Sequence, residues 1–287
     1  MILTLRGEPC RNFCILNKIL IPKDPYDGRE KLVLSNYAAE AAGCLIIIDT
    51  ETLQSEQYEL PNDCGAWALL WLEDRGELLV GTCDHLGSLH CFLMAERRFL
   101  EPLRLESETY LWNFARGGDG LVYASTYPGC ALVQYDPKAR RMVSLGHVGS
   151  ESKNQYSRNV FTTSAGDIAV SAGYYHNEAW LYRIRSGEWI PLGEEGDRVQ
   201  GIGDGFIAVG HGGRYKFYDP ETLEQLGGPF SESSKPETLA GCSQAVREYL
   251  AETLHPQPIP GLPAGLRGLK TASGCEIGVI GQELFLW

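Results

Sequence analysis

A short pattern that recurs along this chain of 287 residues constrains its fold more than any other feature. In each copy a run rich in apolar residues ends mostly in a small residue, and a turn then leads to further apolar residues. The copies are Lys31–Ser35, Glu77–Gly81, Gly120–Ser125, Asp167–Ser171, Phe206–Gly210 and Glu276–Ile280. Counted between their last residues, which we call the anchor residues, the spacings are 46, 44, 46, 39 and 70. A regular period of this length is typical of proteins built from repeated sheets.

A second apolar run follows each of the first five copies, and three of these runs end in aspartate turns. The turns begin at Asp49, Asp136 and Asp219. Aspartate favours turns because its side chain accepts hydrogen bonds from backbone N–H groups further along the chain. We therefore predict an all-β fold, a β-propeller of about six blades. Each blade is a four-stranded antiparallel sheet, with strands A to D running from the central channel outwards.

The spacing of 70 indicates an insertion between blades five and six, over residues 231–265. Within it, Lys235–Leu254 has the apolar periodicity of a helix, and Pro236 suits the first turn. The insertion connects a strand D to the next strand A, so we expect the helix on the same face as the site described below. There it acts as a lid, as a plug or as a partner-binding element.

The two ends of the chain complement each other. The last blade offers strands over 266–271, 275–280 and 283–287, but no strand D. Because Ile2–Leu5 precede the first strand A, we expect residues 1–8 to supply the missing strand and close the ring. Residues 1–287 then form one domain. The alternative is that the chain is the front part of a longer protein, with an exposed strand edge on the last blade.

The charge balance limits the partners. The formal net charge is −12, which argues against nucleic acid and against anionic membrane surfaces. The chain has no apolar run long enough to span a membrane, and its first residues lack the pattern of a signal peptide. The nine cysteines are odd in number and irregularly spaced, so we expect reduced thiols and a cytoplasmic protein. A secreted protein that has lost its signal is the alternative.

Three stretches resemble the bacterial NHL/YVTN/WD40-like propellers: residues 119–129, residues 135–137 and residues 218–222. The resemblance implies a scaffold that enzymes and binding modules share. A second resemblance rests on Gln155–Asn159 followed by Tyr174, Tyr175 and His176. These residues are similar to propellers associated with polysaccharide breakdown, including some uronate lyases.

One face of the predicted propeller gathers polar and aromatic residues, because its B–C loops and D–A connections emerge together. The B–C loops contribute Asn36, Tyr37, Asp84, His85, Tyr127, Tyr174, Tyr175, His176, His211 and Arg214. The first residues of strand A contribute Trp67, Trp112, Asn113, Arg158, Asn159 and Arg267. Arginines and imidazoles at one mouth of an acidic body would attract an anionic ligand or sugar. The aromatic rings suit the faces of sugar rings.

This set of residues suggests β-elimination on a uronate-containing glycan. The reaction needs a cation for the carboxylate, a base for the α-proton and an acid for the leaving oxygen. We expect Arg158 and Arg267 to neutralise the carboxylate. The base comes from His85, His176 or His211, and the acid from Tyr127, Tyr174 or Tyr175. Substrate binding falls to Trp67, Trp112, Asn113, Asn159, Arg214 and Arg267.

Other interpretations stay open. The tryptophans would serve equally well as wedges in the core, and Arg158 could pair with Asp167 or Glu178. The same face would also suit a non-catalytic module that binds a protein, peptide or glycan, or a structural domain of a larger enzyme. The cluster over Cys83–Cys91 suggests a metal, but strand alternation puts His85 in a loop and His90 in a strand. We therefore expect no metal and no cofactor.

Overall fold

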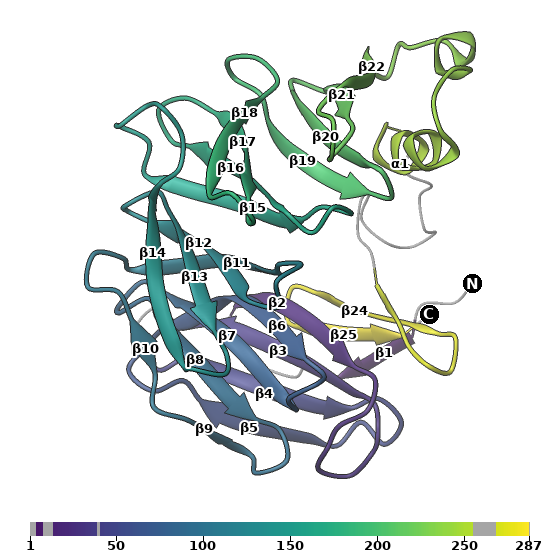
Figure 1. The fold of residues 1–287 in the computed structure, drawn as a ribbon. Coiled ribbons are helices and arrows are strands. Elements are labelled where there is room, and N and C mark those ends of the chain that lie inside the picture. Colours follow the sequence, from purple (N-terminus) through teal and green to yellow (C-terminus); the bar gives the residue numbers. More distant parts are fainter. Residues whose placement is uncertain (1–3, 8–13, 39–40, 255–267, 287) are drawn as a thin grey trace. The chain divides into compact units, whose positions relative to one another are not determined.

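The computed structural model describes residues 4–7, 14–38, 41–254 and 268–286 (Figure 1). The chain divides into two compact units. The first comprises residues 1–111 with 258–287, and the second comprises residues 112–257. Each unit consists of antiparallel sheets whose strands follow one another in sequence, and the described residues contain one α-helix. None of the described helices is long and apolar enough to cross a membrane.

The first unit holds three of the predicted blades: blades one and two and the last blade. A single pair, Tyr37 with Gly65, joins the strands of blades one and two into one larger sheet. Blade one consists of β2 (Cys14–Ile21), β3 (Lys31–Tyr37), β4 (Cys44–Asp49) and β5 (Ser55–Glu59). Blade two consists of β6 (Gly65–Leu72), β7 (Glu77–Cys83) and β8 (Ser88–Leu93), with β9 (Arg98–Phe99) and β10 (Leu103–Arg104) both paired to β8. The last blade consists of β23 (Leu269–Lys270), β24 (Glu276–Ile280), β25 (Glu283–Leu286) and β1 (Thr4–Gly7).

The outer strand of the last blade comes from the beginning of the chain. In that sheet β1 pairs antiparallel with β25, so that Thr4 faces Leu286 and Leu5 faces Phe285. The edge of β25 that the chain would otherwise leave open is therefore hydrogen-bonded. The number of blades in a closed ring, and the single domain over 1–287, stay predictions.

The second unit holds the other three blades. Blade three consists of β11 (Tyr110–Arg116, which begins in the first unit), β12 (Val122–Tyr127), β13 (Ala131–Asp136) and β14 (Arg141–His147). Blade four consists of β15 (Tyr156–Thr162), β16 (Ile168–Gly173), β17 (Glu178–Arg183) and β18 (Glu188–Leu192). Blade five consists of β19 (Arg198–Gly203), β20 (Phe206–His211), β21 (Arg214–Tyr218) and β22 (Gln225–Phe230).

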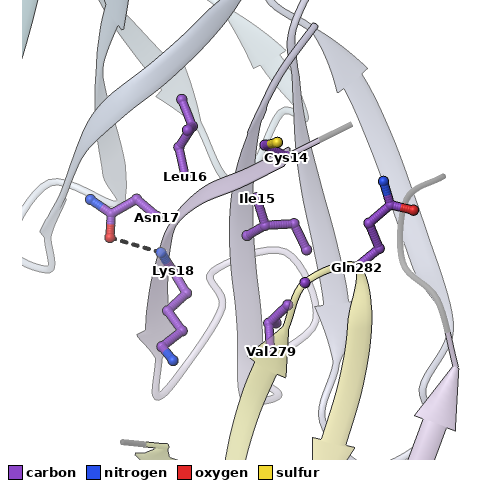
Figure 2. Close-up of a pocket in the computed structure, with 8 residues that line it drawn as sticks. Cys14, Ile15, Leu16, Asn17, Lys18, Val279 and Gln282 are labelled. Atoms are coloured by element: carbon purple, nitrogen blue, oxygen red, sulfur yellow. Dashed lines mark hydrogen bonds between the residues drawn. The ribbon is translucent and has the colours of Figure 1, made fainter. Parts of the chain in front are cut away.

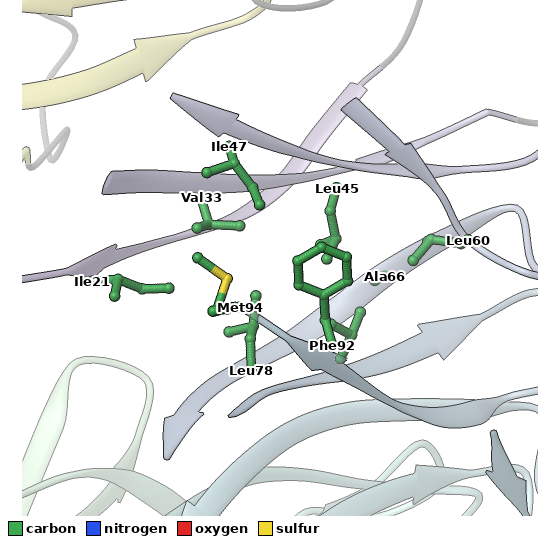
Figure 3. Packing of buried hydrophobic residues seen from close by; sticks show 10 residues of the cluster. Ile21, Val33, Leu45, Ile47, Leu60, Ala66, Leu78, Phe92 and Met94 are labelled. Carbon is green, nitrogen blue, oxygen red and sulfur yellow. The ribbon is translucent and has the colours of Figure 1, made fainter. Parts of the chain in front are cut away.

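The hydrophobic core lies between successive blades. Figure 3 shows the cluster between blades one and two, where Val33 and Ile47 meet Leu78 and Phe92. All four side chains are buried, and all four come from strands B and C. Strands B and C read as nearly continuous apolar runs because both of their faces are covered.

The structure confirms the predicted hydrogen bonds of the aspartate turns. The Asp49 carboxylate accepts hydrogen bonds from the N–H groups of Glu51 and Thr52 at 3.1 and 2.7 Å. Asp136 and Asp219 make the same pair of bonds in their own turns. This repeated turn joins strand C to strand D.

The insertion differs from the continuous helix predicted over Lys235–Leu254. A short 3₁₀ helix covers Pro236–Leu239, and α1 begins only at Gln244 and ends at Leu254. Gly241 lies in the break, as expected of a residue that weakens helices. The buried residues Val246 and Leu250 pack α1 against blade five, beside Phe206 and Phe217. The remainder of the insertion, residues 255–265, lies outside the described residues.

Two kinds of side-chain hydrogen bond recur in the blades. The first kind joins neighbouring blades. The Ser35 hydroxyl donates to the Ala66 carbonyl of the next blade at 2.8 Å, and the Ser171 hydroxyl accepts from the Val199 N–H at 2.8 Å. Both serines are anchor residues. Each ties strand B of one blade to strand A of the next.

The second kind of hydrogen bond is made by a buried polar residue in the loop between strands D and A. Asp63, Asn154 and Asp197 occupy this loop in three blades, and all are at most 2% exposed. Asp63 accepts hydrogen bonds from the Thr82 hydroxyl at 2.6 Å and the Leu86 N–H at 2.8 Å. The carboxylate thereby fixes the B–C loop of its blade.

Replacing Asp63 tests this kind of hydrogen bond. Burial raises the pKa of Asp63, but hydrogen bonds, chiefly from His90 and Thr82, outweigh burial and hold the pKa below its ordinary value of 3.8. The ionised form therefore stabilises the fold above the unfolded-state pKa, and this contribution is lost as the pH falls through the folded-state pKa. We expect Asp63→Ala to lower the free energy of unfolding by about 3–5 kcal/mol at neutral pH.

Urea denaturation at pH 7 and at pH 3 measures the effect. Asp204→Ala, at an exposed turn between β19 and β20, is the control. An Asp63→Ala midpoint equal to that of the control would show that Asp63 does not hold the loop.

Candidate functional site

The second unit brings four predicted site residues into one aromatic cluster. The ring of Tyr156 lies at its centre, stacked on Tyr127 with ring centroids 4.6 Å apart. Tyr174 lies 5.6 Å from Tyr156 on the same measure, and Trp112 also lies 5.6 Å from it. The Arg158 guanidinium carbon is 4.5 Å from the Tyr156 centroid and 5.1 Å from that of Trp112. Such cation–π contacts hold the guanidinium at the cluster.

A cavity of about 320 Å³ opens beside this cluster. Its lining comes from strand A of blades four and five and from the B–C hairpin of blade four. The lining residues are Tyr156, Arg158, Asn159, Ser171, Ala172, Gly173, Tyr174, Asn177 and Arg198. We call it the arginine cavity, because two arginines are its cationic groups.

The two arginines occupy equivalent positions in neighbouring blades. Arg158 pairs with the anchor residue Ser171, and Arg198 pairs with the anchor residue Gly210. In both strands a β-bulge follows within the next residues, at Asn159 and at Gln200. A bulge bends the strand and redirects its side chains, which is why bulges are frequent beside binding sites.

Hydrogen bonds on one peptide hold the two strands together. The Ser171 hydroxyl accepts from the Val199 N–H, and the Asn159 side-chain amide donates to the Val199 carbonyl at 3.1 Å. Val199 directly follows Arg198. These bonds therefore fix the backbone of Arg198 relative to the strands of blade four.

Neither arginine is neutralised within the part of the chain that the structure describes. The ion pairs considered for Arg158 are not formed, because both carboxylates are engaged elsewhere. Asp167 accepts from Arg183 at 2.7 Å, and Glu178 accepts from Ser150 at 2.7 Å and from the Trp180 indole at 3.0 Å. The arginine cavity thus offers two guanidinium groups that an anion can bind.

Of the remaining predicted residues of the second unit, only Asn159 lines the cavity. Tyr175 contacts His176, and the His176 imidazole is 3.8 Å from Glu195. His211 ends β20, and its Nδ1 lies 2.6 Å from Asp197. Asn113 bonds to the neighbouring Phe114 N–H. Arg214 begins β21 rather than lying in the loop, and it pairs with His211 across the strands.

In the first unit, Asp84 joins two tyrosines from neighbouring blades. Its carboxylate oxygens accept from the Tyr37 hydroxyl at 2.5 Å and from the Tyr110 hydroxyl at 2.8 Å.

The other predicted residues of the first unit that the structure describes are not part of this contact. The His85 ring nitrogen Nδ1 is 2.9 Å from the Asn62 carbonyl oxygen. Trp67 occupies the bulge of β6 and is 36% exposed, so it is not a fully buried core wedge. Asn36 is buried and accepts from the Cys44 N–H. Arg267 lies outside the described residues.

The first unit also contains a cavity of about 490 Å³ between β2 and the last blade. Figure 2 shows its lining, where the Asn17 side chain accepts from the Lys18 N–H. Burial lowers the pKa of Lys18. Among the described residues, none of the predicted site residues lines this cavity, and the described lining contains no aromatic ring. It therefore matches the sequence prediction less well than the arginine cavity.

In the Cys83–Cys91 segment the two histidines lie in different elements. His90 lies in β8, fully buried, with its Nε2 3.3 Å from Asp63, whereas His85 lies in the loop. Among the described residues, no group of three or more His, Cys, Asp or Glu side chains is arranged to hold a metal ion.

The sequence prediction missed six of the residues that line the arginine cavity, and two of these, Arg198 and Tyr156, carry side chains that could act on a ligand. Arg198 lies 12 residues before its anchor residue Gly210, whereas Arg158 lies 13 before Ser171, so a fixed spacing passes over Arg198. Tyr156 was not selected because it precedes the position from which strand A was counted. Allowing the count to vary by one residue would have found Arg198.

The Asp84 contacts predict unusual tyrosine titration. The hydrogen bond to Asp84 raises the pKa of Tyr37 to about 12, and burial together with Asp84 raises the pKa of Tyr110. These phenols stabilise the fold below their ordinary pKa of 10.0, and this contribution is lost as the pH rises through the raised values. We expect Asp84→Asn to lower both values in a titration followed by tyrosinate absorbance. Unchanged curves for this variant, relative to Asp204→Asn, would contradict the assignment.

Comparison with known proteins gives the fold and no closer relative. No family model matches the chain, and no curated protein matches it. Solved structures do match. A streptogramin B lyase structure matches with a TM-score of 0.53 at 11% identity, over 70% of this chain and 66% of that one. The structure of U3-55K matches with 0.57 at 12%, over 82% and 70%.

A chain of the mitotic checkpoint complex matches with a TM-score of 0.51 at 13% identity, over 68% of this chain and 61% of that one. The chain therefore spans just under two thirds of the lyase and checkpoint chains. Identities this low carry the fold alone. Together with the repeated antiparallel sheets, they show that the chain has a β-propeller fold.

Proposed function

We propose that this chain is a carbohydrate-active protein that binds a uronate residue of a glycan in the arginine cavity and cleaves the glycan by β-elimination. One observation carries the proposal. Arg158 and Arg198 line one cavity without a carboxylate partner among the described residues, beside the rings of Tyr156 and Tyr174. A uronate has the matching features, a carboxylate and a ring with an apolar face.

The electrostatics favour such a ligand. The chain carries a formal net charge of −12, so an anion meets a repulsive surface except where cations gather. Arginine binds carboxylate in a two-pronged geometry that lysine cannot reproduce. Two arginines on the carboxylate also withdraw charge from the neighbouring carbon, and this stabilises the carbanion-like transition state of elimination.

In the proposed reaction, a base removes the proton from the carbon next to the carboxylate. Its electron pair forms a double bond to the adjacent carbon, the glycosidic C–O bond breaks, and the leaving oxygen takes a proton from an acid. The histidines expected as the base do not line the cavity. We therefore assign the roles of base and acid to Tyr156 and Tyr174, the proton-transfer side chains that do.

A lyase assay tests the reaction directly. Purified chain is incubated with polygalacturonate, alginate and glucuronan, and the ultraviolet absorbance of the unsaturated product is followed. We expect activity on at least one of these, reduced about 10²–10³-fold in kcat/KM by Arg158→Ala. Arg185→Ala is the matched control, because Arg185 is exposed in the turn between β17 and β18, at the other end of the blade. Equal losses in the two variants would contradict a role for the cavity.

A second candidate function is a non-catalytic module that binds a protein, peptide or glycan. It is favoured by the exposure of Tyr174 and Tyr175, 71% and 55%, which lie side by side at the rim. The Lys153 ammonium lies 4.7 Å from the Tyr175 ring centroid. The matched chain from a checkpoint complex belongs to an assembly of proteins.

Calorimetry separates the two candidates. If uronate oligosaccharides bind and the absorbance assay gives no product, the chain is a glycan-binding module. If they neither bind nor react while the protein is folded, both the uronate specificity and the lyase reaction are wrong. A protein partner then becomes the better account of the exposed tyrosines.

A further inference from the structure

The backbone at Tyr174 is strained. Its φ is 114°, in the left-handed region that side chains with a Cβ rarely adopt. An aromatic residue there destabilises the fold unless its surroundings impose the conformation. The surroundings do so, because the buried Asn154 side chain accepts hydrogen bonds from the N–H groups of Tyr175 and His176, both at 3.0 Å.

Two of the other blades also have a positive φ at this position. Tyr174 lies three residues after its anchor residue, and the equivalent residues are Asp84 in blade two and Gly213 in blade five. They have φ values of 73° and 74°. Glycine adopts this conformation without strain and aspartate tolerates it. The other three blades have Ala38, Pro128 and Glu283 at this position, and none of these has a positive φ. Tyr174 is therefore the only large side chain among the three blades in which this residue has a positive φ.

Packing does not explain why a tyrosine stands at this position. The Tyr174 side chain is 71% exposed, the highest value among the large hydrophobic residues described. Within the described ranges its one ring contact is with Tyr156, with ring centroids 5.6 Å apart. The residue thus destabilises the backbone and buries little of its own surface. What it does provide is an aromatic face at the rim of the arginine cavity.

We propose that Tyr174 is a specificity-determining residue, held in a strained conformation so that its ring covers the ring of a ligand whose anionic group lies on Arg158 and Arg198. This inference rests on the proposed function and narrows the ligand. A small anion without a ring, such as acetate, gains nothing from Tyr174, whereas a uronate ring stacks on it.

Substitution with glycine separates strain from packing. In the full chain, Tyr174→Gly should raise Tm by about 2–5 °C, because the strain is removed. The same variant should bind oligogalacturonate about tenfold more weakly in calorimetry, because the ring is lost. Tyr174→Ala should lose the binding without the gain in Tm, and Tyr174→Phe should retain the binding. Tyr175→Gly is the matched control, since its φ is ordinary, and it should not gain stability.

The outcomes distinguish this inference from the proposed function. A lower or unchanged Tm in Tyr174→Gly would overturn the inference, since the tyrosine would then support the fold. Unimpaired oligogalacturonate binding by Tyr174→Gly would also overturn it, while the uronate site would stand. Absence of binding by the unsubstituted protein would overturn the proposed function and, with it, the ligand assigned to Tyr174.

Discussion

The hydrogen bond between the Val199 N–H and the Ser171 hydroxyl is the contact on which the arginine cavity depends. Ser171 faces Arg158 across the strands of blade four, and Val199 follows Arg198 in blade five. This bond therefore holds together the two stretches of backbone from which the arginine side chains extend. A serine hydroxyl can make it because the anchor position is buried and small, so that strand A of the next blade approaches closely. The bulges at Asn159 and Gln200 then direct the neighbouring side chains towards the cavity.

The same construction recurs in both units with different residues at the equivalent positions. Ser35 ties blade one to blade two as Ser171 ties blade four to blade five, yet the strand A residue that faces Ser35 is Asn17 and not an arginine. Asp84 lies three residues after its anchor residue, as Tyr174 does, and its carboxylate accepts hydrogen bonds from two tyrosines. A repeated scaffold thus supplies equivalent positions, and the residue chosen at each position decides whether a loop is fastened or presents a ligand-binding group.

The repeats made much of the fold predictable, because the alternation of buried strands and aspartate turns depends on local physics. Asp49, Asp136 and Asp219 show this most clearly. The site was less predictable. Counting from the anchor residues found Arg158, Tyr127 and Tyr174, whereas Arg198 was missed because β19 and β20 pair with a spacing one residue shorter. His211 was expected in the site, but its Nδ1 is bonded to Asp197, and no sequence pattern identified that partner. The backbone strain at Tyr174 could not be predicted from the repeat spacing either, because it depends on the dihedral angle φ.

A double-substitution cycle tests the central claim most directly. Oligogalacturonate affinity is measured by calorimetry for the unsubstituted chain, for Arg158→Ala, for Arg198→Ala and for both together, with Arg185→Ala as the reference. If one carboxylate lies on both guanidinium groups, each single change weakens binding about tenfold or more, and the two losses do not multiply in the double variant. Two results would contradict a shared anion site in the arginine cavity. One is a loss of affinity in the double variant equal to the product of the two single losses. The other is single variants that bind as tightly as the Arg185→Ala reference.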